Sequence, residues 1–206
     1  MPSDDFNSSV FVNCPFDADY IPLLRPLLFT LRYLGFVPRI ALESTDSGEP
    51  RIQKIVSLIE SSRYGIHDLS RLQAKKQGEY SRFNMPFELG VDIGCKLFRK
   101  GKWAQKRCLI LEKEKYRYQI AISDLSNSDI LDHNDQPEMI VKHVRNWLVQ
   151  QCLGKGPSPT QIWYAYNDFW ADTRAKLESE GFTPEEIDDL SVSEFITRIS
   201  EWIKQD

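Results

Sequence analysis

The chain's first apolar run reads Ser9-Val-Phe-Val-Asn-Cys14, and a helical repeat of leucines follows it from Asp19 to Leu34. Gly35 ends that repeat, and the same order of apolar run and amphipathic repeat returns further along the chain. The predicted strands are 9–14, 36–42, 64–67 and 107–111, and the predicted helices are 19–34, 50–59 and 85–99. Strands that alternate with helices indicate a parallel sheet with helices on both faces. The sequence therefore predicts a small doubly wound, flavodoxin-like α/β fold.

The pattern weakens beyond Glu112. The segment 116–122 fits either a fifth strand or a short helix, and periodicity does not choose between them. Further helices are predicted over 137–153, 160–180 and 191–204, with a capping-box start at Thr183. The only linker-like stretch, Gly154-Lys-Gly-Pro-Ser-Pro159, separates the first of these helices from the rest. We expect an α/β domain over 1–153 and a helical appendage over 158–206.

Composition excludes several classes of protein. The chain has 206 residues, 41% of them apolar, which suffices for one domain with a real core. The net charge is −4 and the basic residues are scattered, unlike the basic stripe of a duplex-binding protein. No run approaches the roughly 18 apolar residues of a membrane helix, and the N-terminus lacks an apolar signal core. The four cysteines show no Cys-x-x-Cys spacing and read as reduced thiols. We expect a cytoplasmic protein that binds neither duplex nucleic acid nor a membrane.

The clearest candidate for chemistry is Glu88, in the stretch Arg82-Phe-Asn-Met-Pro-Phe-Glu-Leu-Gly90. Asn84 as N-cap and Pro86 in the first turn would place Glu88 near a helix start. Its apolar neighbours should raise its pKa by desolvation. Gly90 and Gly94 should leave one helix face bare, so that the helix lies close to the sheet.

Asp68 ends the third predicted strand, and a strand end and a helix start can place two carboxylates in one crevice of an α/β sheet. A structural alternative exists for each residue. The helix dipole alone favours an acid in the first turn by roughly 0.3–1 kcal/mol, and Asp68 could simply cap a turn.

Other kinds of site lack a signature. There is no Gly-rich phosphate loop, no metal-ligand spacing among the three histidines and no nucleophile elbow. A metal enzyme or an acyl-transfer hydrolase is therefore not predicted. A polar cluster at 123–129, with Asp124, and the nearby His133 follows a possible last strand. It could complete the pocket, and the alternative is a turn capped by Asp124.

Three motifs together resemble the nucleoside 2-deoxyribosyltransferase-like superfamily, which is related in fold to Toll/interleukin-1 receptor (TIR) domains. They are Cys14-Pro-Phe-Asp17, the strand-end Asp68 and Asn84-Met-Pro-Phe-Glu88-Leu-Gly90, within residues 9–111. The resemblance implies that Glu88 acts at the anomeric carbon, as nucleophile or transition-state stabiliser, while Asp68 handles the base. It also implies a role in bacterial antiphage defence. The chain departs from the transferases, which usually show Asp-Ser-Gly-Thr before the glutamate where this chain has Tyr80-Ser-Arg-Phe-Asn-Met-Pro86.

That departure favours a charged nucleotide over a free deoxynucleoside. NAD⁺ is the leading candidate, because its nicotinamide leaves as a neutral base, and no metal or organic cofactor is required. The residues expected to contact substrate are Cys14, Phe16, Asp17, Arg71, Arg82, Asn84, Met85 and Asp124, with Phe16 stacking on a base or sugar. Further cations expected near the crevice are Arg63, Lys75 and Lys76, whose alternative role is that of ordinary solvated residues. The alternative function is a non-catalytic module that binds a nucleotide signal and passes it to a partner.

The C-terminal segment carries an aromatic stripe. Trp163, Tyr166 and Trp170 recur at spacings of three and four and so share one helix face. Such a stripe is buried either against the chain's own sheet domain or in a homo-oligomer, and the sequence leaves both open.

Overall fold

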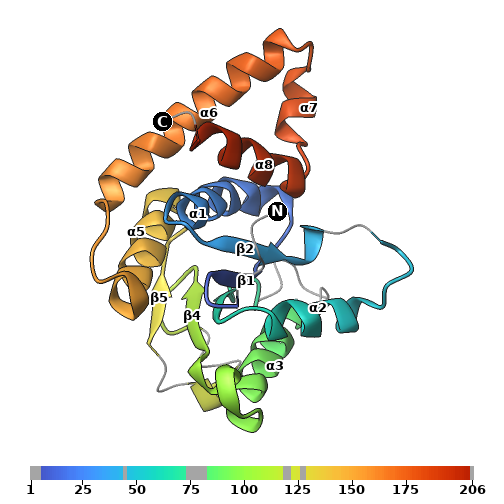
Figure 1. Ribbon diagram of the computed structural model, residues 1–206, viewed down its shortest axis with the longest axis vertical. Coiled ribbons are helices and arrows are strands. Elements are labelled where there is room, and N and C mark those ends of the chain that lie inside the picture. The colour runs from blue at the N-terminus through green and yellow to red at the C-terminus, as the bar shows by residue number, and fades with distance from the viewer. Residues whose placement is uncertain (1–5, 44–45, 73–82, 118–121, 126–128, 205–206) are drawn as a thin grey trace.

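The computed structural model describes residues 6–43, 46–72, 83–117, 122–125 and 129–204. Its centre is an all-parallel sheet of five strands in the order β2-β1-β3-β4-β5 (Figure 1). The strands are β1 Ser9–Asn13, β2 Val37–Ile40, β3 Tyr64–Asp68, β4 Arg107–Glu112 and β5 Ile130–Asp132. The helices are α1 Ile21–Tyr33, α2 Arg51–Glu60, α3 Asn84–Phe98, α5 Pro137–Leu148, α6 Pro159–Ser179, α7 Pro184–Asp188 and α8 Val192–Trp202. The predicted doubly wound α/β fold is confirmed.

Helices cover both faces of the sheet. Val10 and Val12 of β1 point into a core shared with α1 and α5. Phe11, which lies between them, points to the other face and packs against α2. Successive strand residues face opposite ways, so a strand covered on both sides must be apolar at nearly every position. This explains why the continuous apolar runs predicted the central strands well.

The sequence left the segment 116–122 open between a fifth strand and a short helix, and the structure has its fifth strand further along the chain. Observed β5 is Ile130–Asp132, only three residues long and half-buried throughout. Neither its length nor its composition gives a strong strand pattern, because its pairing to β4 comes from the sheet and not from local preference. Part of the segment 116–122 lies outside the described residues. The helix predicted over 137–153 is α-helical as far as Leu148 and ends in one π-helical turn, Val149–Leu153.

Two expectations for α3 are corrected. Asn84 is the first helical residue, and the capping position belongs to Phe83, which makes no side-chain capping bond. The face with Gly90 and Gly94 points away from the sheet. A Cβ atom at Gly90 would meet nothing within 4 Å, and one at Gly94 would meet only the ring of Phe98, 3.8 Å away on the same helix. The helix faces the protein interior through larger side chains, including Leu89, so docking to the sheet does not explain the glycines.

The C-terminal helices pack on α1. The Phe29 ring on α1 lies 5.3 Å from that of Phe169 and 5.6 Å from that of Tyr166, both on α6, and 6.0 Å from that of Trp202 on α8. Figure 1 shows α6 and α8 alongside α1, on the far side of that helix from the sheet. One hydrophobic cluster joins these helices to the strands. The intramolecular alternative therefore accounts for Tyr166, which is buried, whereas Trp163 and Trp170 are only half-buried.

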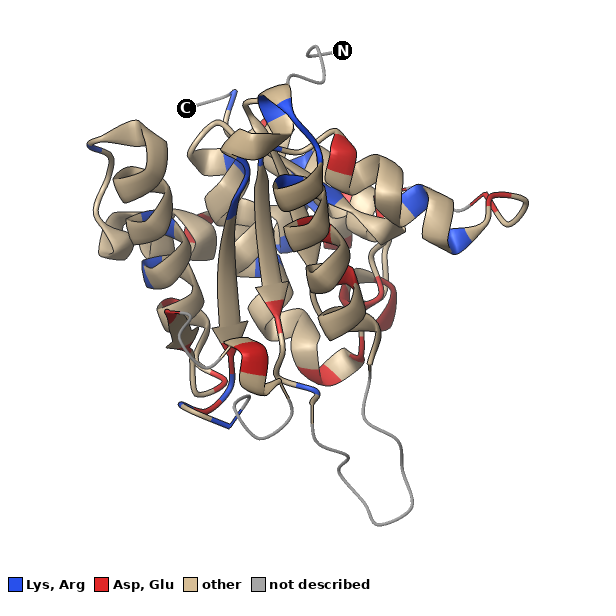
Figure 2. Ribbon diagram, turned by 90° about the horizontal axis from the view of Figure 1, so that it is seen from below, with Lys and Arg blue, Asp and Glu red and all other residues tan. Residues whose placement is uncertain are grey.

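Two surface properties bear on partners. Within the described ranges, no helix combines the length and the apolar character needed to cross a membrane. Figure 2 shows acidic residues gathered around the end of the sheet to which the strand arrows point. That end is the carboxyl edge, where open α/β sheets bind ligands.

Candidate active site at the carboxyl edge

Glu88 lies in the second turn of α3, largely buried, and lines a cavity. Only 7% of the residue is exposed, and Oε1 is 3.8 Å from a guanidinium nitrogen of Arg51 on α2. Burial raises the pKa of Glu88 above its ordinary value, and the positive charge of Arg51 opposes that rise. The desolvation expected from the sequence is thus confirmed. The cavity measures about 200 Å³ and is lined by Arg51, Ile52, Ile55, Asn84, Phe87 and Glu88.

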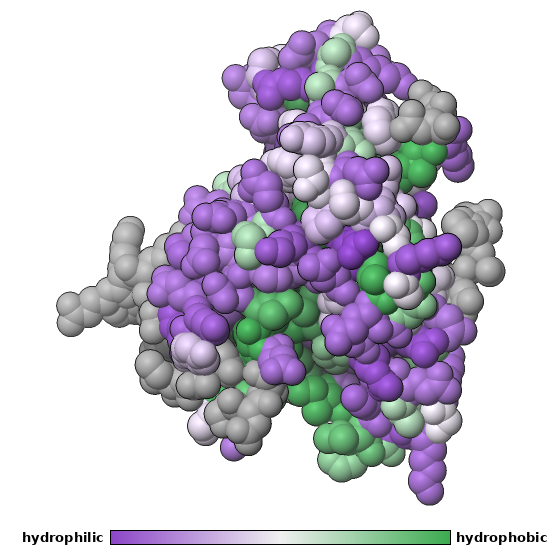
Figure 3. All heavy atoms as spheres, turned by 90° about the vertical axis from the view of Figure 1, so that its left-hand side faces the viewer, coloured by the Kyte–Doolittle hydropathy of each residue, from purple (hydrophilic) through white to green (hydrophobic). Residues whose placement is uncertain are grey.

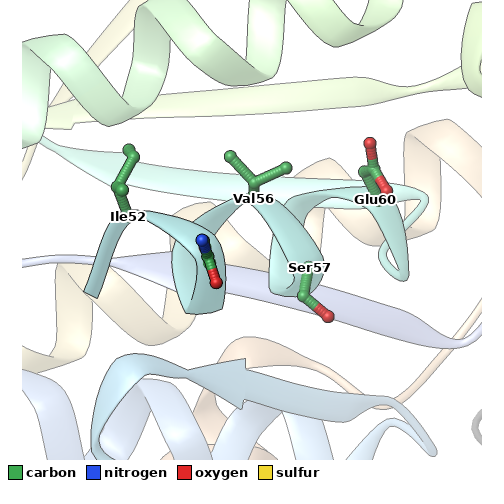
Figure 4. A pocket seen from close by; sticks show the side chains of 5 residues that line it. Ile52, Val56, Ser57 and Glu60 are labelled. Carbon is green, nitrogen blue, oxygen red and sulfur yellow. The ribbon is translucent and has the colours of Figure 1, made fainter. Parts of the chain in front are cut away.

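A second hollow adjoins this cavity along α2. It measures about 290 Å³ and is lined by Ile52, Gln53, Val56, Ser57 and Glu60. Figure 4 shows Ile52, Val56 and Glu60 side by side, extending from the same side of the helix. Ile52 lines both spaces, so the region around Glu88 continues as a shallow surface along α2. Neither space alone reaches the roughly 300 Å³ at which small-molecule sites begin.

The end of β1 holds the first turn of α3. The Asn13 side-chain amide donates a hydrogen bond of 2.9 Å to the Met85 carbonyl. Cys14, the next residue of the chain, is fully buried, and burial is the main reason why its pKa is raised far above the ordinary value. The negative charges of Asp68, Glu88 and Asp17 raise the Cys14 pKa further, in that order. Cys14 therefore lies within electrostatic range of all three carboxylates.

Asp68 is fully buried and engaged in hydrogen bonds. Its carboxylate accepts from the Tyr20 hydroxyl at 2.6 Å and from the Ser70 backbone N–H at 2.8 Å, and it lies 3.0 Å from Nε2 of His133. Burial pushes the pKa of Asp68 upward, but the hydrogen bonds from His133, Ser70 and Tyr20 outweigh it and lower the pKa. The site thus keeps Asp68 ionised as an acceptor.

The protonation of His133 follows from its neighbours. Its Nδ1 accepts a hydrogen bond of 3.1 Å from the Asp135 backbone N–H, so the ring proton resides on Nε2, which faces Asp68. His133 thus contacts Asp68, and the expectation that it completes the substrate pocket stays a prediction. Asp124, by contrast, is exposed in the short 3₁₀ helix Ser123–Leu125. No hydrogen bond or ion pair links Asp124 to either carboxylate in the described chain.

The expected pair of carboxylates does not form. Asp68 alternates along β3 with Tyr64 and Ile66, which puts its side chain on the α1 face, whereas Glu88 belongs to α3 on the opposite face. Both residues are described, and no hydrogen bond or ion pair joins them. Glu88 lines a cavity, while Asp68 is sealed behind Tyr20 and His133. Of the two carboxylates that the sequence expected to share a crevice, only Glu88 lines a cavity.

Asp17 and Arg71 bind each other across the crevice. One guanidinium nitrogen of Arg71 lies 2.9 Å from Oδ1 of Asp17, and Nε lies 3.2 Å from Oδ2. This bidentate pair ties the segment after β1 to the segment after β3, and its hydrogen bonds raise the pKa of Arg71. Phe16, half-buried, packs against the clusters on both sides of the sheet. Phe16 therefore sits at the carboxyl edge, as the sequence predicted.

The remaining predicted residues have mixed outcomes. Asn84 is exposed and lines the Glu88 cavity, while the Met85 side chain is buried. Arg63 precedes β3 and so lies at the opposite, amino edge, where it contacts Asn7 and the Tyr64 ring. Its expected place near the crevice was wrong, because a strand carries its first and last residues to opposite edges. Arg82, Lys75 and Lys76 lie outside the described residues.

Sequence reasoning missed a buried polar chain beneath α3. The group that Asn13 turns to the Met85 carbonyl must be its NH₂, and the same NH₂ lies 3.0 Å from Nδ1 of His67. Nδ1 is therefore an acceptor, and Nε2–H of His67 donates to Asp92 Oδ2 at 2.9 Å. The other Asp92 oxygen is 3.0 Å from the Lys106 ammonium. Burial raises the pKa of Asp92, but His67 and Lys106 outweigh it and lower the pKa.

This chain of contacts joins α3 to three other elements. Lys106 also donates to the Ile59 carbonyl at 2.8 Å and to the Ser62 carbonyl, at the end of α2. A Cβ atom at Gly65 on β3 would lie 2.3 Å from Asp92 Oδ2, so only glycine fits there. The one signal in the sequence that could have revealed the network is Asp92, a charged residue within the apolar run after Glu88. Ligand atoms of His67, Asp92 and Cys108 lie within 4.8 Å of one another, as in a metal site, but Lys106 already supplies a positive charge to Asp92.

A larger cavity lies away from Glu88. It measures about 540 Å³ and is bounded by the first turn of α1 and by α6, with Pro22, Trp163, Tyr166 and Trp170 in its lining. Its cation, Arg25, lies 4.5 Å from the centre of the Trp170 ring and donates to the carbonyls of Ile187 and Asp188. Arg25 therefore binds the end of α7 to α1.

Comparison with known proteins does not place the chain in a family, since no family model, curated protein or solved structure matches it. The fold and the site define a doubly wound α/β protein in which a largely buried carboxylate, Glu88, lines a cavity beside the carboxyl edge. Membership of the deoxyribosyltransferase-like superfamily stays a prediction based on its three motifs.

Proposed function

We propose that the protein cleaves, or transfers at, the N-glycosidic bond of a nucleotide, with Glu88 as the catalytic carboxylate and NAD⁺ as the leading substrate. One observation carries this proposal. Glu88 is a fixed and largely buried carboxylate that lines a cavity at the carboxyl edge of the sheet. We also propose a cytoplasmic location, where such a nucleotide would be available.

The chemistry needs little else. The bond between the anomeric carbon and the base nitrogen breaks, and its electron pair leaves with the base. Positive charge then develops on the sugar ring, and a carboxylate held in a low-dielectric site stabilises that charge far better than water does. Water or an acceptor hydroxyl then forms the new bond to the anomeric carbon and gives up its proton.

Arg51 supports both charge balance and nucleotide binding. Its side chain is 58% exposed and lies 3.8 Å from Glu88, so it favours the ionised carboxylate that burial disfavours. Its guanidinium also has donors free to face a phosphate, which guanidinium groups bind well. Arg71, the cation predicted from sequence, is already bonded to Asp17. We therefore propose Arg51 as the phosphate-binding cation nearest the reacting centre.

The buried state of Asp68 bears on the identity of the leaving base. Because Asp68 is sealed among Tyr20, Ser70 and His133, we propose that it holds the edge of the sheet together instead of protonating a base. A base that leaves as a neutral molecule needs no acid. Nicotinamide leaves NAD⁺ in that form, so a site in which Asp68 does not act as an acid suits NAD⁺ better than an adenine or guanine nucleoside.

A second candidate function is a nucleotide-sensing module without turnover. Two observations favour it, namely the small volume around Glu88, about 200 Å³, and the missing second carboxylate. Such a module would bind the nucleotide in the same place and pass the signal to a partner.

One experiment separates the two functions. The purified protein is incubated with NAD⁺, NADP⁺, ATP and deoxynucleosides, freed base is measured by chromatography, and binding is measured by calorimetry. Release of nicotinamide by the wild type, lost in Glu88→Gln, supports the enzyme. Binding without release supports the sensing module. Neither binding nor release with any of these compounds would refute both.

A further inference from the structure

The outer face of α3 carries an exposed apolar surface that no described part of the chain covers. Four large side chains of this surface are mostly exposed: Phe83 by 65%, Phe87 by 60%, Leu97 by 68% and Phe98 by 86%. Figure 3 shows the side of the molecule that lies to the left in Figure 1, and hydrophobic residues are gathered in the lower half of that side. The opposite end, formed by the C-terminal helices, is mostly hydrophilic in the same view.

The exposed residues form one stripe with two glycines at its centre. At 100° per residue, positions 83, 87, 90, 94, 97 and 98 fall within about 100° of the helix circumference. We call these six residues the α3 stripe. Asp92 lies on the opposite side of the helix, where it meets His67 and Lys106. The stripe therefore faces directly away from the protein interior.

The glycines have no explanation within a single copy. Each glycine in a helix costs about 1 kcal/mol relative to alanine, yet a methyl group at Gly90 would meet nothing within 4 Å. At Gly94 it would meet only a ring of its own helix at ordinary contact distance. Glycines four residues apart on an apolar helix face allow a second helix backbone to approach closely. No contact among the described residues thus accounts for these glycines, whereas a second helix packed on this face would.

The stripe is complementary to itself. Gly90 and Gly94 are equidistant from Asp92, and so are Phe87 and Leu97. Two α3 helices that cross antiparallel about a two-fold axis level with Asp92 would place Gly90 against the other copy's Gly94, and Phe87 against the other copy's Leu97. A two-fold interface requires this relation, because each residue pairs with the residue that pairs with it.

The area is sufficient for a second copy. Taking about 200 Å² for each large side chain, the exposed fractions leave about 550 Å² of apolar surface on each copy. Two copies would bury about 1,100 Å² from these side chains alone, which passes the roughly 1,000 Å² expected of a specific interface. We propose that the protein forms a homodimer through the α3 stripe, with the two α3 helices antiparallel.

The dimer would also change the surroundings of Glu88. Phe87 belongs to the α3 stripe and to the lining of the Glu88 cavity. A second copy seated on the stripe would add walls to a cavity that one copy leaves small and open. The dimer itself does not depend on the proposed function, since it rests on the α3 surface alone.

Sedimentation velocity on the full chain at micromolar concentration tests the proposal. We expect a dimer for the wild type, and Leu97→Asp should raise its dissociation constant by at least about 30-fold, the factor expected for a hot-spot residue. Tyr164→Asp is the matched control, because Tyr164 is 64% exposed on α6, and it should leave the dimer intact. Circular dichroism of each variant establishes that it is folded.

Gly94→Ala adds a test in the opposite direction. Alanine should stabilise α3 within each copy while it weakens association, a combination that a merely structural glycine would not produce. A wild type that stays monomeric at these concentrations overturns the proposal, including the case in which the monomer instead sediments with phosphatidylcholine vesicles. A dimer broken by Tyr164→Asp and not by Leu97→Asp overturns it as well.

Discussion

Two carboxylates near the carboxyl edge have opposite electrostatic environments. Glu88 has a raised pKa because burial dominates and only Arg51 compensates. Asp68 has a lowered pKa, although it is more deeply buried, because it accepts hydrogen bonds from a hydroxyl, a backbone N–H and an imidazole. Ionisation of Glu88 therefore destabilises the folded state, whereas ionisation of Asp68 stabilises it. Opposite pKa shifts of two nearby carboxylates are common in active sites where one takes part in the reaction and the other holds the structure.

Replacement of Glu88 by glutamine should remove activity and stabilise the fold. Activity should fall by about 100-fold or more, because the charge that stabilises the transition state is lost. A carboxyl whose pKa is raised on folding disfavours the folded state once it ionises, so the stability gain of Glu88→Gln should be absent well below the ordinary pKa of 4.5 and grow as pH rises through the raised pKa. Thermal unfolding from acid to neutral pH measures this. Exposed Glu201→Gln is the control, and a Glu88→Gln protein that is less stable at neutral pH would contradict the prediction.

Arg51→Gln should move the acid limb of the pH–rate profile to higher pH. Arg51 lowers the pKa of Glu88, so its loss lets burial raise that pKa further, and the active ionised form then appears only at higher pH. The Michaelis constant for NAD⁺ should rise too if Arg51 binds a phosphate. The profile of kcat/KM measures both effects, and an unchanged acid limb would remove Arg51 from the electrostatics of the site.

At the scale of elements, α3 is the part of the fold on which the candidate site depends. Its first turn is bonded to Asn13 at the end of β1, and its middle is bonded through Asp92 to His67 and Lys106. These contacts fix both the height and the rotation of the helix against the sheet. The position of Glu88, one turn before Asp92, follows from them.

Asp92→Asn should destabilise the protein by about 3 kcal/mol or more, because it leaves the Lys106 ammonium buried without its counter-charge. The double variant Asp92→Asn with Lys106→Met should recover part of that loss. Glu60→Gln is the control, since its ion pair with Arg99 is exposed and worth at most about 1 kcal/mol. Urea unfolding at neutral pH gives the three values. If Asp92→Asn and Glu60→Gln lower the free energy of unfolding equally, the buried network contributes no more to stability than an exposed ion pair does.

The sequence predicted elements better than it predicted their contacts. β1, α1, β3 and β4 have local patterns of period and length, and the structure confirms them. β5 has three residues and no pattern of its own, so the sequence did not predict it. The pairing of Glu88 with Arg51 and of Asp92 with Lys106 joins residues that are not neighbours in the chain. Side-chain direction at the end of β3 decided that Asp68 faces α1, and a one-residue change of register would have reversed it.

At the scale of the whole molecule, the C-terminal helices complete the core on the α1 side. Phe29 of α1, fully buried, packs against Tyr166 and Phe169 of α6 and Trp202 of α8. Ile162, Phe169, Phe195 and Ile199 of those helices belong to the same cluster as Val10 and Val12 of β1. A boundary drawn at the linker 154–157 would thus cut through one hydrophobic core.

Removal of residues 158–206 should leave a chain that does not fold cooperatively. The truncation would expose the outer side of α1, including Phe29, and a surface of this size drives collapse or aggregation. Phe29→Ala in the full chain should cost about 3–5 kcal/mol, as large-to-small changes in a packed aromatic core do. Tyr164→Ala on the solvent side of α6 should stay within about 0.5 kcal/mol of the wild type. Calorimetry on the full chain and on residues 1–157 measures these differences. If residues 1–157 unfold cooperatively at an unchanged Tm, the helices α6 to α8 form the separate appendage that the linker-like stretch predicted, and the single core described here is wrong.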